Sequence, residues 1–181
     1  WLGVGVLTPA QAPIREESVA TSTEVAVRNE EPFPRRIIIP KLNLDAPFAG
    51  SLGLQENGEV EVPDDFETVG WYRYGPTPGE LGPAVVLGHV DSYEGPAVFF
   101  SLGQLEPGDE MRVDRADGST AVFAVTRLER VEQDAFPTES VYGNIDHAGI
   151  RLITCSGTYD RGVSRYTHNL IVYGELVRVD N

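Results

Sequence analysis

The sequence predicts an all-β domain that closes into a barrel of about eight strands. Three observations support this prediction: strand-type segments recur along most of the chain, few segments show a helical period, and prolines fall at the ends of those segments or between them. The strand-type segments lie at 36–40, 59–63, 84–90, 110–115, 120–131, 150–155 and 169–179. A sandwich is the alternative architecture, and in either case we expect only short helices or turns in the loops.

The first strands are bounded by residues that interrupt a sheet. RIIIP at 36–40 and EVEVP at 59–63 both end in proline, which has no amide donor and is least disruptive at a strand end. AVVLGHV at 84–90 is an apolar run that is interrupted at Gly88. His89 therefore lies at the end of a strand.

A hairpin and a long loop organise the second half of the chain. The residues ADGS at 116–119 separate the segments 110–115 and 120–131, and Asp-Gly between alternating segments predicts a tight hairpin. Residues 132–149 carry no strand signal and come directly before the strand at 150–155. A strand-free segment of this length is usually functional, so we expect it to border the site.

The chain divides into a short arm and one folded domain. Residues 1–7 are apolar but far fewer than the roughly 20 that a membrane helix needs, and residues 8–35 are rich in Pro, Ser, Thr and Glu, as flexible tethers are. We assign 1–35 to an apolar stub and a flexible arm, and 36–181 to the folded domain. We expect further apolar residues before Trp1 that anchor the domain to a membrane; an ordered arm wrapped on the domain is the alternative.

Composition excludes several classes of function. With 14 basic against 28 acidic side chains the net charge is −14, which argues against nucleic acid or an anionic membrane surface as the main partner. A single cysteine excludes internal disulfides and zinc sites built on several thiolates, and no acidic segment has calcium-loop spacing. We therefore expect neither a metal nor a cofactor.

Cys155 is the first candidate for chemistry. It follows the strand-type residues RLIT and precedes a Ser-Gly pair, which is expected to end the strand. A free cysteine is most often a small buried apolar residue, whereas a nucleophilic cysteine is normally paired with an acid or base and with a positive group. His89 suits that pairing, His147 lies in a polar loop, and His168 remains a rival base.

Two motifs carry a family resemblance. The segment AVVLGHVDS contains His89, and LITC places Cys155 66 positions after that histidine. Together they resemble the two signature segments of the sortases, cysteine transpeptidases that join sorting-signal proteins to the cell wall of Gram-positive bacteria. Further segments at 37–48, 69–92 and 169–176 agree, so the resemblance covers the whole domain. The GWY…PGE run is most similar to class E or class F sortases of high-GC actinobacteria, with class F favoured.

The resemblance implies a mechanism and a site. Cys155 would attack the Thr–Gly amide of an LPxTG-like sorting signal, and His89 would donate a proton to the leaving amine. An amine from lipid II or a pilin lysine would then resolve the thioacyl enzyme. Thr154, Ile153 and Asn169 would bind the peptide. We expect a monomer on the extracellular face of the plasma membrane, acting on surface proteins that carry the sorting signal.

The third catalytic residue of the family is an arginine, and here the sequence departs from the family. Counting back five positions from Gly174 reaches Asn169, which donates hydrogen bonds but carries no charge. By strand alternation Arg165 lies on the same face as Asn169, about 13 Å away along the strand. We take Arg165 as the third catalytic residue if the chain curls back over the thiol, and Asn169 as the donor if it does not.

Two other functions could use the same residues. A different Cys/His hydrolase, such as a papain-like protease, needs the same groups but usually places its cysteine at the start of a helix and its histidine later in the chain. A secreted β-barrel that binds a peptide or glycan, with Cys155 merely buried, needs no catalysis. Alkylation separates these cases, because a catalytic thiol is accessible and a structural one is inert.

Overall fold

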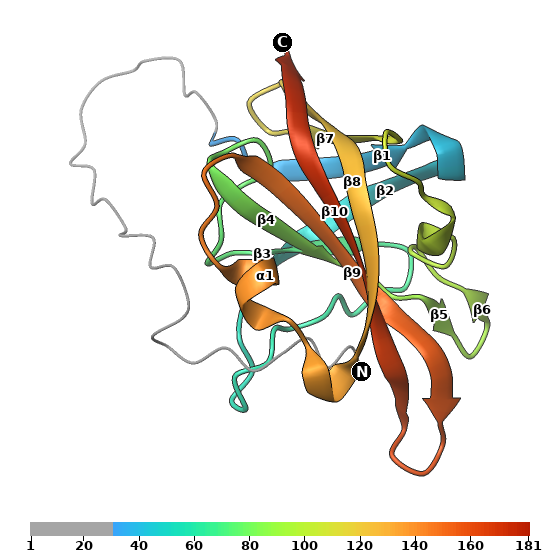
Figure 1. The fold of residues 1–181 in the computed structure, drawn as a ribbon. Helices are drawn as coiled ribbons and strands as arrows, with labels where there is room; N and C mark the ends of the chain where they lie inside the picture. The colour runs from blue at the N-terminus through green and yellow to red at the C-terminus, as the bar shows by residue number, and fades with distance from the viewer. Residues whose placement is uncertain (1–30) are drawn as a thin grey trace, which may run out of the picture.

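The computed structural model describes residues 31–181, in which eight strands close a barrel (Figure 1). The barrel strands are β1 (Pro34–Ile39), β2 (Leu44–Leu52), β3 (Val69–Tyr72), β4 (Gly82–Leu87), β7 (Glu110–Arg115), β8 (Thr120–Glu132), β9 (Ala148–Asp160) and β10 (Arg165–Asp180). They follow one another around the ring in the order β1-β2-β3-β4-β9-β10-β8-β7, and β7 pairs with β1. The predicted all-β closed barrel is confirmed.

Short elements fill the connections between the barrel strands. They are β5 (Asp91–Ser92), β6 (Gly95–Pro96), η1 (Pro40–Leu42), η2 (Leu102–Gln104), η3 (Gln133–Ala135) and α1 (Thr138–Tyr142). The segment 132–149, expected to be free of strands, holds η3 and the helix α1, but its ends belong to strands: Glu132 to β8, and Ala148 and Gly149 to β9. The part of the arm at 1–30 lies outside the described residues, and within 31–181 no helix is long and apolar enough to cross a membrane.

Three details of the strand prediction are wrong. EVEVP at 59–63 alternates as a strand does, but its contact is a one-residue bridge from Val60 to Leu54. The strands β2 and β3 were not predicted, because β2 contains a proline and a glycine and β3 is only four residues long. The third error concerns β9, which does not stop after the cysteine but runs on to Asp160.

The extended half of β9 pairs with β10 and projects beyond the barrel as a hairpin (Figure 1). The strand continues past the Ser-Gly pair at which it was expected to end. Gly157 allows this because it has a φ of +82°, which glycine adopts readily. A Cβ at this position would lie 2.5 Å from the Thr167 hydroxyl, so a larger residue would not fit without a shift. The register of the hairpin slips between Tyr166 and His168, opposite this glycine.

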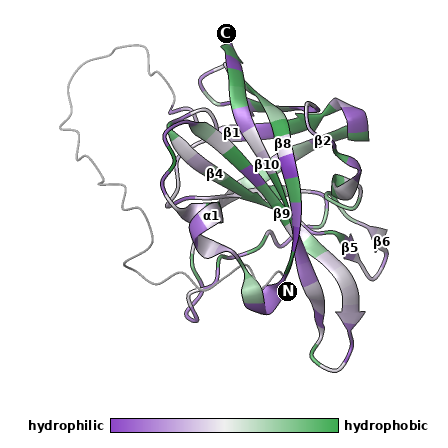
Figure 2. Ribbon diagram, in the orientation of Figure 1, coloured by the Kyte–Doolittle hydropathy of each residue, from purple (hydrophilic) through white to green (hydrophobic). Residues whose placement is uncertain are grey.

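The pairing of β4 with β9 is parallel and buried on both faces. All six residues of β4 are buried, and β9 is buried from Gly149 to Cys155. Buried parallel strands are expected to read as nearly continuous apolar runs, as both of these segments do. The green band of β4, β9 and β10 in Figure 2 shows this apolar centre.

The apolar residues pack on two sides of these strands. Inside the barrel, Val86 and Leu152 join a large cluster that includes Phe123. Outside it, the alternate residues of the same strands form a second cluster, which we call the outer cluster. Its buried members are Leu52, Val60, Tyr72, Val85, Leu87, Val141, Tyr142, Ile153, Cys155, Ile171 and Tyr173. Because Val141 and Tyr142 belong to α1, the helix covers the outer side of the strands.

Candidate active site

Cys155, the single cysteine of the sequence, lies in β9 as a member of the outer cluster. Only 5% of the residue is exposed. Burial raises the pKa of its thiol to about 11, and the carboxylate of Asp91 adds to this increase. The thiol is therefore protonated near neutral pH in this conformation.

His89 follows β4 at the position that continues its pairing with β9. The parallel register joins Leu87 to Ile153, and the Gly88 amide donates a hydrogen bond of 3.2 Å to the Ile153 carbonyl. β4 ends at Leu87, and extending the same register by two residues puts His89 level with Cys155. The sequence separation of the two residues therefore equals the register offset of the two strands.

The imidazole of His89 is held by two contacts. Its Nε2 lies 2.7 Å from the carbonyl oxygen of Pro63, and because a carbonyl only accepts, Nε2 carries a proton and donates. The ring also packs against Phe66, with centroids 4.7 Å apart. This contact assigns Nε2 as the donor and leaves Nδ1 as the acceptor nitrogen of the neutral ring.

Asn169 is the residue of β10 that lies directly across from Cys155. It is fully buried, and the Gln133 Nε2 donates a 3.4 Å hydrogen bond to its side-chain oxygen. This contact turns the oxygen of the Asn169 amide toward η3, which leaves the amide nitrogen as the donor for other groups. Gln133 was not identified from the sequence, which gave no signal for it beyond its place in the long loop.

Arg165 does not lie beside Cys155. Its register partner is Asp160, in the projecting hairpin, and its Nη2 forms an ion pair of 2.5 Å with Asp134. The position is four residues from Asn169, or about 13 Å along a strand. The structure thus places the arginine on the hairpin and the asparagine beside the thiol.

The two remaining predicted binding residues lie on opposite faces of β9. Ile153 is in the outer cluster with Cys155, two residues away on the same face. Thr154 alternates to the barrel side, is 1% exposed, and has a hydroxyl with no hydrogen-bond partner among the described residues. The structure therefore brings Ile153, and not the Thr154 side chain, to the face that carries the thiol.

The other two histidines lie in different surroundings. His168 is the register partner of Ser156, and its Nδ1 lies 2.7 Å from the Thr167 hydroxyl. His147 is partly exposed in the loop before β9, with its Nδ1 3.0 Å from the Asp146 carboxylate. Neither residue shares the level of Cys155 in the sheet as His89 does.

Sequence reasoning also missed a hydrogen-bonded pair beside the site. The Tyr166 hydroxyl donates to the carboxylate of Asp91, two residues after His89. The HVD sequence contained the available signal, a carboxylate close to the histidine. Within residues 31–181 no group of three or more His, Cys, Asp or Glu side chains could hold a metal ion.

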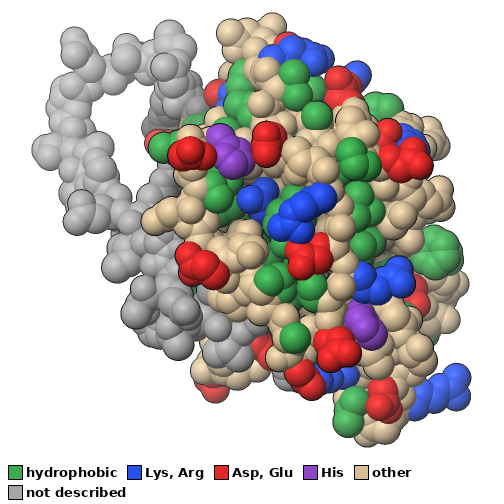
Figure 3. All heavy atoms as spheres, viewed as in Figure 1, with side chains coloured by type: hydrophobic (Ala, Val, Ile, Leu, Met, Phe, Trp, Pro, Cys, Tyr) green, Lys and Arg blue, Asp and Glu red, His purple; other side chains and the backbone are tan. Residues whose placement is uncertain are grey.

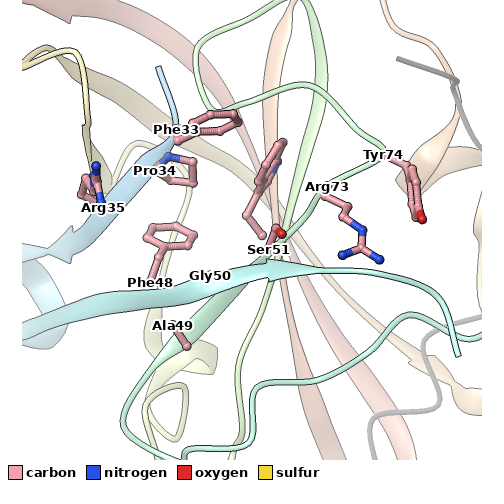
Figure 4. Close-up of a pocket in the computed structure, with 10 residues that line it drawn as sticks. Phe33, Pro34, Arg35, Phe48, Ala49, Gly50, Ser51, Arg73 and Tyr74 are labelled. Carbon is pink, nitrogen blue, oxygen red and sulfur yellow. The ribbon is translucent and has the colours of Figure 1, made fainter. Parts of the chain in front are cut away.

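A cavity of about 820 Å³ lies elsewhere on the barrel. Figure 4 shows its lining, which includes Phe33 just before β1, Phe48 in β2, and Arg73 and Tyr74 just after β3. None of its lining residues belongs to the group around Cys155. The face that carries β8, β9 and β10 mixes acidic and basic side chains, without one continuous basic surface (Figure 3).

Comparisons with known proteins agree on one family. The sequence model of the Sortase domain matches residues 37–177. Sortase A from Corynebacterium diphtheriae is 22% identical with a TM-score of 0.62, covering 84% of this chain and 64% of its own. Sortase C-1 from Actinomyces oris is 23% identical with a TM-score of 0.59, covering 79% of this chain and 73% of its own.

Other solved structures give the same fold. Sortase A of Listeria monocytogenes is 18% identical with a TM-score of 0.60, covering 83% of this chain and 90% of its own. Streptococcus agalactiae sortase C1 is 22% identical with a TM-score of 0.60, and this chain spans 66% of its length. No curated protein matches the chain.

Proposed function

The chain belongs to the sortase family of cysteine transpeptidases, and on that premise we propose that it cleaves an LPxTG-like sorting signal between Thr and Gly and transfers the acyl part to an amine. One observation supports this proposal above the others. Leu87 pairs with Ile153 in a parallel register that brings His89 level with Cys155. A thiol and an imidazole on adjacent strands are the pair that nucleophilic acyl transfer requires.

In the first half of the proposed reaction, the Cys155 sulfur attacks the carbonyl carbon of the threonine. The C–N bond to glycine then breaks, and the imidazolium of His89 gives its proton to the leaving amine. In the second half, an incoming amine attacks the thioester carbonyl and gives a proton to the neutral imidazole of His89, and the sulfur leaves as thiolate, which restores the starting protonation states. Because burial raises the thiol pKa to about 11, the thiolate is a minor species until substrate binding changes its surroundings.

The third catalytic group is Asn169 or Arg165. The tetrahedral intermediate carries an oxyanion that needs donors aimed at it. Asn169 is the register partner of Cys155, and its oxygen accepts from Gln133, which orients its nitrogen as a donor. Arg165 takes the role only if the hairpin curls back over the thiol and the ion pair with Asp134 opens. The register favours Asn169.

The peptide would bind along the outer cluster. Ile153, Leu87 and Ile171 give this face an apolar floor next to the thiol, which suits the Leu-Pro part of a sorting signal. The helix α1 and the rest of segment 132–149 cover the same face, so this segment would help to select the peptide. Thr154 would contribute through its backbone, since its side chain faces the barrel interior.

Further parts of the proposal rest on the family resemblance. We place the protein in class E or class F, with class F favoured by the GWY…PGE run. Its substrates would be surface proteins with a sorting signal, and its acceptor an amine of lipid II or of a pilin lysine. It would act as a monomer at the outer face of the plasma membrane.

The intact mass of the protein after mixing with an LPxTG peptide tests the function. A thioacyl enzyme adds the mass of the peptide up to its threonine, and an added amine removes it again. Cys155→Ala is the matched control and should show no adduct. A rival function is supported by the burial of Cys155, which is 5% exposed: a peptide-binding barrel with an inert thiol. Peptide binding without any adduct would favour that rival.

A further inference from the structure

One hydrogen bond joins two distant parts of the chain beside the thiol. Tyr166, at the start of β10, donates its hydroxyl to the Asp91 carboxylate of β5, 75 residues earlier in the sequence. Tyr166 belongs to the projecting hairpin, whereas Asp91 lies just after His89. The bond therefore connects the hairpin to the segment that carries the histidine.

Both partners of this bond lie close to Cys155. Tyr166 packs against the outer cluster, as does Val90, the neighbour of Asp91. Asp91 and Tyr166 each interact electrostatically with the thiol. Burial and the hydrogen bond to Asp91 raise the pKa of the Tyr166 hydroxyl, so it stays protonated and able to donate. The contact is therefore part of the packing around Cys155, and only 5% of that residue is exposed.

We propose that Tyr166 and Asp91 are positioning residues, whose hydrogen bond holds the hairpin against the segment after His89 and closes the cover over Cys155. A substrate peptide reaches the thiol when this contact opens. The statement about the peptide rests on the proposed function, whereas the statement about the cover does not.

A second tether of the hairpin is weaker. The ion pair between Arg165 and Asp134 joins the hairpin to η3, but both side chains are largely exposed. Exposed ion pairs usually contribute little to stability. A hydrogen bond from a partly buried hydroxyl to a carboxylate contributes more, so the Tyr166–Asp91 contact is the main tether.

Asp91 also sets the charge next to the thiol. The other titratable groups on the surrounding elements are His89, Arg165 with Asp134, and His168 with Glu132 across from it in the sheet. Among the described carboxylates, Asp91 is the one that contributes to the raised pKa of Cys155. A negative charge there disfavours the thiolate, so the closed contact both covers the thiol and keeps it protonated.

Alkylation of the full chain by iodoacetamide tests the cover without any peptide. We compare Tyr166→Phe with wild type from about pH 7 to about pH 10, where thiolate formation controls the rate. Loss of a hydrogen bond to a charged group should speed alkylation of Cys155 by roughly tenfold. Asp91→Asn should speed it as well and shift the pH profile toward lower pH, because it also removes the charge.

Tyr159→Phe is the matched control. Tyr159 lies on the same hairpin with its ring edge-on to Tyr166, at a centroid distance of 5.3 Å, and it takes no part in the bond to Asp91. Its alkylation rate should stay within about twofold of wild type, since only the loss of the Tyr166–Asp91 bond opens the cover. Thermal unfolding of each variant shows whether faster alkylation reflects the hairpin or global unfolding.

The proposal is wrong if Tyr166→Phe is alkylated no faster than Tyr159→Phe and Asp91→Asn leaves the pH profile unchanged. In a peptide assay, Tyr166→Phe should lower KM more than it changes kcat, because less binding energy is used to open the cover. If wild type turns over no peptide, the proposed function fails, and the alkylation result still decides the role of the cover.

Discussion

The two halves of β9 are positioned in different ways. From Gly149 to Ile153 the strand pairs with β4 on one side and with β10 on the other, and it is buried from Gly149 to Cys155. From Ser156 to Asp160 it pairs with β10 alone and becomes exposed. Residues of the first half are fixed by the sheet, whereas those of the second half depend on a few side-chain contacts. The proposed nucleophile belongs to the first half and Arg165 lies opposite the second.

Cys155→Ala removes the proposed nucleophilic thiol from the first half of β9 and should have the largest effect. We expect complete loss of the thioacyl adduct and of peptide cleavage, because no other thiol is present. The circular dichroism spectrum should match that of wild type, since the substitution removes one small buried atom. Peptide cleavage near the wild-type rate would show that Cys155, in the first half of β9, is not the nucleophile.

His89→Ala should lower the rate of peptide cleavage by about 100-fold to 10,000-fold, as loss of a general acid or base commonly does. His168→Ala is the comparison, since that histidine lies in the part of β10 that leads into the hairpin and pairs with Ser156. Its effect should be much smaller. A larger loss from His168→Ala than from His89→Ala would move the acid–base role from the barrel to the hairpin.

Asn169→Ala should cost about 2.7 to 4 kcal/mol of transition-state stabilisation, the usual effect of losing one donor to an oxyanion. The quantity to measure is kcat/KM with the same peptide. Gln133→Ala should give a smaller loss in the same direction, because it only removes the contact that orients the asparagine. An Asn169→Ala variant with wild-type kcat/KM would exclude this donor.

The pH dependence of stability should report the burial of the thiol. The pKa of Cys155 rises from 9.0 to about 11 in the folded chain, so the unfolded chain loses its proton first as pH increases. The stabilisation is complete below about pH 9 and is lost toward about pH 11, by roughly 2 to 3 kcal/mol. Urea unfolding should show this loss in wild type and not in Cys155→Ala.

Arg165→Ala should have the smallest effect if the hairpin stays as the structure shows it. The exposed ion pair with Asp134 contributes about 0 to 1 kcal/mol, so unfolding in urea should change little. Peptide turnover should stay within about threefold of wild type, an activation free-energy change of less than 1 kcal/mol. A loss of two or more orders of magnitude would show that the hairpin closes over the thiol and would restore Arg165 as the catalytic arginine.

The sequence predicted best where strands are long and buried. The apolar runs of β4 and β9 and the Asp-Gly turn before β8 fixed those elements correctly, because hydrophobic pattern and turn chemistry decide them locally. The pairing of His89 with Cys155 was predicted from their residue types and strand-end positions and agreed with a family motif, and the register of β4 and β9 supports this prediction.

The rest depended on contacts that a linear pattern does not contain. The Ser-Gly pair after Cys155 predicts the end of the strand, but Gly157 adopts a positive φ and the strand continues through a register slip. The orientation of Asn169 depends on Gln133, 36 residues away, and the Tyr166–Asp91 bond joins still more distant segments. Tertiary contacts of this kind set the positions of the side chains where the hairpin borders the site.

The parallel pairing of β4 with β9 has a consequence for how the chain folds. Parallel neighbours cannot be joined by a tight turn, so His89 and Cys155 meet only after the intervening β5 to β8 and α1 have been accommodated. Contacts between residues so far apart in sequence form slowly, because a long loop must close first. We therefore expect part of the cover over the thiol to form only when β4 and β9 pair. Addition of a thiol reagent at successive times after dilution from denaturant would measure the fraction of Cys155 that is protected, and hence the rate at which the barrel closes.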